Sequence, residues 1–145
     1  MKIFLPICLI TILIFGCDQK NDKEKVLDLE AEVMTIHDEV MPQMDDIMTL
    51  KSKLSKKIQE MDSLQNIGVS SNTLAEQRIK AVDLNQKLNE SDKAMMSWMH
   101  AYRGDSAKKL KPQEATMYFE AEREKILLVK QTTLKSIQDA KTFLE

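Results

Sequence analysis

The feature that most constrains the fold of this chain is an apolar residue at every seventh position along its first long polar segment. Six side chains keep this spacing without interruption: Val26, Val33, Val40, Ile47, Leu54 and Met61. Others follow three positions later, at Leu29, Ile36, Leu50 and Leu64. A repeat of this kind is typical of helices that pack side by side. The segment is therefore predicted to be a long helix that needs partner helices.

Two later segments carry the same repeat. The second runs through Leu74, Ala81, Leu88, Met95 and Tyr102. The third runs through Phe119, Ile126, Thr133 and Ala140, flanked by Val129, Ile137 and Leu144. Three such helices bury their apolar faces most simply by folding back on one another. The predicted fold class is all-α: an antiparallel three-helix bundle with coiled-coil-like packing.

Glycines separate the predicted helices. Gly68 and Gly104 divide the chain, so that helices are expected at about 23–66, 73–102 and 112–143, within a bundle that spans residues 23–145. Start signals agree with these limits. Asn21 with Glu24 and Thr73 with Glu76 have the spacing of a capping box, and Pro112 suits a first helical position.

Pro42 lies inside the first predicted helix. It lacks the N–H that would pair with the carbonyl of Asp38, so a kink is expected there. A second stripe on this helix is expected to widen the apolar face enough to meet two neighbours. It consists of Leu27, Met34, His37, Met41, Met44 and Met48.

The first 16 residues have the pattern of a bacterial lipoprotein signal peptide. Lys2 gives a positive start, residues 3–15 form an apolar run, and Gly16 is a small residue before Cys17. This run is too short to span a bilayer, which takes about 20 residues. We expect cleavage after Gly16 and lipidation of Cys17 with long acyl chains such as palmitate, which would hold the protein on the membrane.

The location expected from this leader is the bacterial cell envelope, as a membrane-anchored lipoprotein of the outer membrane on its periplasmic face or on the cell surface. Residues 17–22 are expected to form a flexible polar tether. Within it, Gln19-Lys20-Asn21-Asp22 resembles the surface-export signal of Bacteroidota lipoproteins. The formal net charge of the whole chain is −2, and no basic stripe favours nucleic acid as a partner.

Two short motifs carry a resemblance to a known group of proteins. They are His37-Asp38-Glu39-Val40-Met41-Pro42 and Ser97-Trp98-Met99. In these, the chain resembles small Bacteroidota lipoproteins of unknown function, often labelled "viral A-type inclusion protein". That label reflects coiled-coil similarity, and the resemblance implies neither a viral role nor an activity.

The methionines suggest one site for a soft metal. Thioether and imidazole ligands suit Cu(I) or Ag(I), and a His and Met pair can also hold haem iron. If the helices turn near Gly68 and Ala107, the methionine clusters around Met44, Met95 and Met117 meet at one end of the bundle. The candidate ligands are Met34, His37, Met41, Met95, Met99 and His100.

Packing explains the same residues without a metal. Methionine fills irregular cores well, and a proline kink makes the core irregular. Met34, His37 and Met41 share one helix face, and Met95 and Met99 are expected to share the seam. His100 falls at the opposite heptad position and is expected to face solvent. Haem fits less well than copper, because three slim helices rarely leave a wide pocket.

The remaining motifs offer little chemistry. Trp98 and Tyr102 are either a patch for a protein partner or a cap on the core. Arg103-Gly104-Asp105 is interpreted as a loop, and the acid pairs Asp38-Glu39 and Asp45-Asp46 as a solvated helix face. No nucleophile, phosphate-loop or zinc motif is present, so no enzyme activity is expected. The expected function is an interaction or structural module, with Cu(I) or Ag(I) binding as the alternative.

Overall fold

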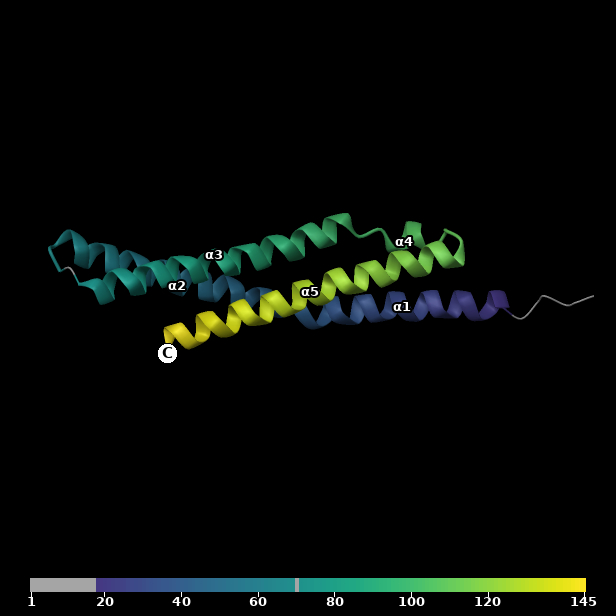
Figure 1. The fold of residues 1–145 in the computed structure, drawn as a ribbon, viewed down its shortest axis with the longest axis horizontal. Coiled ribbons are helices and arrows are strands. Elements are labelled where there is room, and N and C mark those ends of the chain that lie inside the picture. Colours follow the sequence, from purple (N-terminus) through teal and green to yellow (C-terminus); the bar gives the residue numbers. More distant parts are fainter. Residues whose placement is uncertain (1–17, 70) are drawn as a thin grey trace, which may run out of the picture.

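The computed structural model describes residues 18–69 and 71–145, which form an elongated bundle (Figure 1). In chain order the helices are α1 (Asp18–Val40), α2 (Gln43–Asn66), α3 (Asn72–Ala101), α4 (Gly104–Ala107) and α5 (Pro112–Leu144). Helices α1 and α2 follow one direction, α3 returns beside them, and α5 runs parallel to α1 and α2 (Figure 1). The described residues contain no strand. The predicted all-α antiparallel three-helix bundle is confirmed.

The seven-residue repeat forms the core, as predicted. Its members on α1 and α2 are at most 6% exposed, and Ala81, Leu88 and Met95 on α3 are fully buried. Phe119 and Ile126 on α5 are also 0% exposed. Burying side chains of this size drives the folding of the bundle, at about 25 cal/mol for each Å² of apolar surface removed from water.

The second stripe on the first helix does not widen the core as expected. Met44 is half-buried and packs against two of the core groups. Leu27 and Met48, however, are 56% and 59% exposed. Met48 lines the open groove between α2 and α3, and Leu27 lines a pocket beside Leu110, so both side chains stay largely in water. The extra apolar residues therefore remain on the surface.

The break at Pro42 is the predicted kink. The last bond of α1 runs from the amide of Met41 to the carbonyl of His37 (3.0 Å), and the amide of Met44 turns to Met41 (3.1 Å). Pro42 itself keeps helical angles (φ −62°, ψ −22°). Val40 before it and Ile47 after it are both buried, so the heptad repeat continues through the bend.

The α2–α3 turn is closed by Gly68. Its φ of +87° favours glycine, and the amides of Gly68 and Val69 donate to the carbonyls of Gln65 (3.1 Å) and Leu64 (3.0 Å). Helix α3 is capped by Ser71, whose hydroxyl accepts from the amide of Leu74 (3.1 Å). The predicted capping box at Thr73 is therefore wrong by two residues, because α3 already begins at Asn72 and the amide of Leu74 bonds to Ser71.

The start of the first helix also differs from the prediction. Helix α1 begins at Asp18, so residues 18–22 are helical and not a tether, and Asn21 lies inside the helix and not at its cap. Pro112 occupies the first turn of α5, as predicted. The leader and Cys17 lie outside the described residues.

A row of ion pairs joins α1 and α2 to α5, which runs parallel to them. Its members on α1 and α2 are seven residues apart, and each pairs with α5: Lys25 with Glu120, Glu32 with Arg123, Glu39 with Lys130, and Asp46 with Lys141. Each lies one position before a buried seam residue. Such flanking charges set the orientation and register of paired helices, although each exposed pair contributes little free energy.

The two ends of the bundle are built differently. Beyond the end of α3, the short helix α4 takes its place, and Ala107 packs with Val26 and Phe119. At the other end α5 stops first, with Phe143 beneath the ammonium of Lys57 at 5.3 Å. The α2–α3 hairpin continues alone past this point (Figure 1). Among the residues described, no helix has the length and apolar character needed to cross a membrane.

Candidate functional site

The two methionines expected together in the α3 seam lie in different environments. Met95 is fully buried, in a core group formed with valines and isoleucines of α1 and α5. Met99 is 37% exposed, because its neighbour Trp98 takes the core position. The prediction that Met99 shares the seam with Met95 is wrong. On the facing helix, Met34 is half-buried, and Met41 is 37% exposed and not turned inward as expected.

The two histidines also differ in environment. The side chain of His37 is 16% exposed, and its Nδ1 lies 2.9 Å from Oδ1 of Asp38. Its ring packs against Trp98, with the ring centroids 5.6 Å apart. His100 is exposed, as its heptad position predicted. The structure therefore presents one half-buried histidine, held by an aromatic ring and a carboxylate.

The methionine clusters do not all meet at one end, contrary to expectation. Beside Met95, α5 contributes Ile126, and Met117 lies nine residues earlier and is 70% exposed. At 1.5 Å per residue it is about 13 Å away along the helix. The register differs because α4 and its flanking turns lengthen the second connection. Over the described parts of the chain, no three His, Cys, Asp or Glu side chains come together as a metal site.

A row of aromatic rings crosses the bundle beside His37. Trp98 and Tyr102 have centroids 5.0 Å apart, Tyr102 and Tyr118 6.3 Å, and Tyr118 and Phe119 5.3 Å with an edge-to-face angle of 84°. Such pairs are worth about 0.5–1.5 kcal/mol beyond the area that they bury. The sequence pattern indicated Trp98 and Tyr102 as a pair and Phe119 as a core position, but not Tyr118. The position of Tyr118 next to the repeat residue Phe119 was the available signal.

Trp98 and Tyr102 belong to this core. Trp98 is 7% exposed, and Tyr102 packs against two of the core groups. Of the two interpretations offered by the sequence, their burial matches the cap on the core. Burial raises the pKa of Tyr102 to about 12, helped by the negative charge of Glu30 and by Tyr118. Within the described residues, neither Trp98 Nε1 nor Tyr102 Oη has a hydrogen-bond partner.

The Arg103-Gly104-Asp105 tripeptide is part of a folded connection. Arg103 donates from Nη1 to the carbonyls of His100 (2.6 Å) and Tyr102 (2.8 Å), and Gly104 begins α4. A Cβ at Gly104 would lie 2.6 Å from Tyr102 Oη, so the aromatic row needs glycine there. Lys108 bridges α1 and α4 by pairing with Glu30 (2.9 Å) and Asp105 (3.1 Å).

The acid pairs lie on the charged surface, as expected. Asp38 is 73% exposed, and Glu39 and Asp46 are paired with lysines of α5. Elsewhere, the displaced pKa values of charged groups belong to residues in ion pairs. Arg78, for example, lowers the pKa of Asp62 by hydrogen bonding to it. These displacements follow from pairing and give no indication of a catalytic acid or base.

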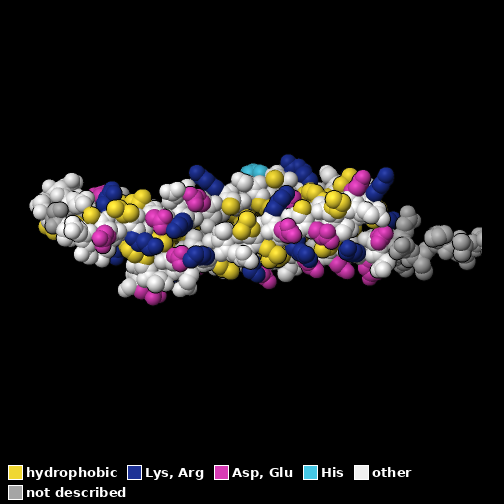
Figure 2. Space-filling model, viewed as in Figure 1, with side chains coloured by type: hydrophobic (Ala, Val, Ile, Leu, Met, Phe, Trp, Pro, Cys, Tyr) yellow, Lys and Arg dark blue, Asp and Glu magenta, His cyan; other side chains and the backbone are white. Residues whose placement is uncertain are grey.

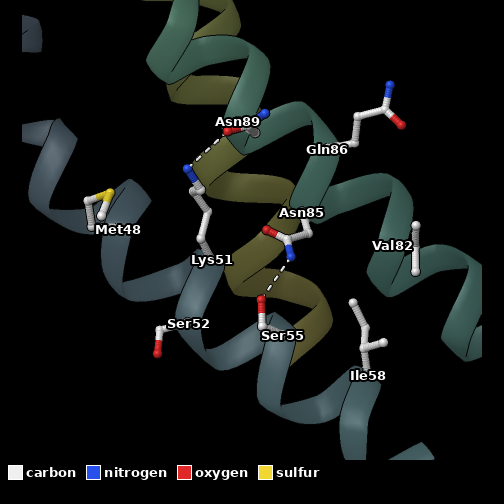
Figure 3. Close-up of a pocket in the computed structure, with 9 residues that line it drawn as sticks. All are labelled: Met48, Lys51, Ser52, Ser55, Ile58, Val82, Asn85, Gln86 and Asn89. Atoms are coloured by element: carbon white, nitrogen blue, oxygen red, sulfur yellow. Dashed lines mark hydrogen bonds between the residues drawn. The ribbon is translucent and has the colours of Figure 1, made fainter. Parts of the chain in front are cut away.

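An open groove of about 630 Å³ runs between α2 and α3 (Figure 3). Polar side chains bridge it. Asn85 donates to the hydroxyl of Ser55 (3.0 Å), and the ammonium of Lys51 donates to Asn89 (3.1 Å) and to Asp92 (3.3 Å). The polar side chains that bridge the groove form hydrogen bonds with one another, and these bonds fix the register of α2 against α3.

Comparison with known proteins gives no match to this chain among protein-family models, curated proteins or solved structures. The resemblance to the small Bacteroidota lipoproteins stays a prediction.

Proposed function

We propose that the protein is a lipid-anchored helical module of the bacterial cell envelope that acts by binding another protein and not by catalysis. Cys17 would be the lipidated residue and the outer membrane the site of anchoring, on its periplasmic face or on the cell surface. Cys17 immediately precedes Asp18, the first residue of α1. The anchor would therefore lie at the α1 end of the bundle.

The observation that carries this proposal is the apolar tip at the opposite end. Ile67 and Val69, in the α2–α3 turn, are 76% and 50% exposed, and Leu64 in the last turn of α2 is 40% exposed. Residues 18–66 at 1.5 Å each extend over about 70 Å, so the tip would be held far from the membrane. Apolar side chains gathered in a single exposed turn favour contact with a protein surface.

The face of the molecule seen in Figure 2 also favours binding over catalysis. Charged and apolar side chains alternate along the face in view, without a deep hollow (Figure 2). Tyr102 is the core residue whose pKa is strongly raised, and its hydroxyl is enclosed beside Gly104. Catalytic groups need to reach a substrate. A tyrosine sealed in the core does not meet that need.

The proposal is tested by photo-crosslinking in cells. A photoreactive amino acid replaces Ile67 at the tip or, as a matched control, the exposed Gln131 in the middle of α5. We expect irradiation to give one discrete protein adduct from position 67 and none from position 131. Equal adducts from both positions, or none from the tip, would contradict a partner at the tip.

The anchor is tested separately with Cys17→Ala. We expect the variant to leave the membrane fraction, because each buried CH₂ of the acyl chains contributes about 0.8 kcal/mol of membrane binding. Fractionation followed by mass spectrometry of the N-terminal peptide measures this. An unmodified Cys17 in the wild-type membrane fraction would exclude lipid anchoring at this residue.

A further inference from the structure

Four methionines lie where α2 and the α1–α2 break face α3, and one of them, Met44, also packs against two of the core groups. Met41, Met96 and Met99 are 37%, 47% and 37% exposed, and Met44 is half-buried. They form two pairs, each with a spacing of three residues: Met96 and Met99 share one face of α3, and Met41 lies in the break just before α2, which carries Met44. A packing role accounts for Met95, which is 0% exposed, but not for thioethers left in water.

The register of α2 and α3 places three of these methionines together. Lys51 on α2 reaches both Asn89 and Asp92 on α3, at 3.1 Å and 3.3 Å. One heptad nearer the kink, the equivalent positions are Met44 on α2, and Met96 and Met99 on α3. Because both helices are continuous over this step, Met44 faces Met96 and Met99 as Lys51 faces its two partners.

The fourth methionine follows from the neighbouring row of contacts. Arg78 bonds to Asp62, and one heptad along Asn85 bonds to Ser55. Met41 lies two heptads before Ser55, and Met99 lies two heptads after Asn85. The same row therefore brings Met41 opposite Met99. Pro42 bends the chain here but keeps helical angles, so Met41 stays on the same side as Met44.

The geometry points to a binding site for Cu(I) or Ag(I) formed by the thioethers of Met41, Met44, Met96 and Met99. Neutral, polarisable sulfur ligands select soft monovalent ions over Zn²⁺ or Mg²⁺, which prefer imidazole, thiolate or oxygen ligands. The partial exposure of these methionines gives an ion a path to the sulfur atoms. This site is independent of the proposed tip interaction, and it leaves out the core residue Met95 and the exposed His100.

The test uses the full chain, purified in detergent from membranes, with reduced copper as the probe and a coloured Cu(I) chelator as competitor. We expect one Cu(I) per chain, sulfur-only coordination by X-ray absorption, and no binding of Zn²⁺ at the same concentration. Met44→Leu with Met99→Leu should weaken Cu(I) binding by at least about tenfold, since losing even an outer-shell partner of a metal ligand costs about 10- to 100-fold. Circular dichroism and the melting temperature should change little, because the swap nearly conserves volume.

Two controls make the assignment specific. Met117→Leu changes a methionine that is 70% exposed on α5, and Met95→Leu changes the buried one. Both should keep the wild-type affinity. Binding that persists unchanged in the double variant would belong to other ligands and overturn the proposal. Failure of the wild type to compete with the chelator, or an equal loss in Met117→Leu, would overturn it as well.

Discussion

The two ends of this bundle share one sequence pattern and differ in how well they are buried. At the α1 end, α4 and α5 cover the seam, and Val26 and Phe119 are 6% and 0% exposed. At the tip, α2 and α3 pair without α5. Leu64 there is 40% exposed, whereas Leu29, at the equivalent position of the repeat on α1, is 6% exposed. The presence of a third helix, more than the heptad repeat itself, thus decides which apolar residues become core.

The largest expected loss of stability comes from a substitution at the covered α1 end of the bundle. Phe119→Ala should lower the free energy of unfolding by about 3–5 kcal/mol, because a fully buried aromatic ring leaves a cavity. Leu64→Ala at the tip should cost well under about 2 kcal/mol, since much of that side chain is already in water. Chemical denaturation of both variants measures the difference. Equal losses would show that the tip is covered in solution.

Gly104→Ala tests the fit of α4 at the same end. The added Cβ would fall 2.6 Å from Tyr102 Oη and push the aromatic row out of place. Overpacking of this kind costs about 1–3 kcal/mol. A melting temperature equal to that of the wild type would mean that Tyr102 has room to move.

Gly68→Ala is the corresponding change at the tip. Nothing lies within 4 Å of the added Cβ, so the cost comes from the φ of +87° alone, at about 1–2 kcal/mol. Amide hydrogen exchange should show the loss mainly in the last turn of α2 and the first turn of α3. Faster exchange throughout α5 as well would contradict the independence of the tip.

The smallest effect is a dependence of the tip on pH. Arg78 holds the pKa of Asp62 below its ordinary value in the folded chain. The pair therefore stabilises the tip above the unfolded pKa of Asp62, near pH 4, and this contribution is lost as pH falls through the lowered folded value. The protection factors of the tip amides, which compare each exchange rate with the intrinsic rate at the same pH, should fall at acid pH relative to neutral pH. In Asp62→Asn, this acid-dependent change should shrink.

The heptad repeat made the core predictable, because burial selects the same face of a helix at every seventh residue. Val33, Leu54 and Ile126 were assigned to the core and are fully buried. The kink at Pro42 was predictable for a similar reason, since proline lacks a backbone donor wherever it occurs.

Features that depend on long-range geometry were not predictable. The position of Met117 depends on the length and packing of the α3–α5 connection, and the sequence does not display the α4 turn that lengthens it. Ser71 and Thr73 are both suitable N-cap residues for α3. Which of them caps the helix depends on where the chain leaves the Gly68 turn. The methionine pairs were noticed, but their facing partners follow from hydrogen bonds such as Lys51 to Asn89.

The part of the hairpin in which α2 and α3 pair without α5 makes the length of this molecule an adjustable quantity. Beyond Phe143, only α2 and α3 pack against each other, so only their register has to be kept. Their contacts repeat every seven residues. Removing one heptad from each helix there would shorten the rod by about 10 Å while every remaining pair kept its register. Adding a heptad to each would lengthen it equally. The length of the hairpin can thus change in steps of one heptad, and the three-helix part of the bundle stays the same.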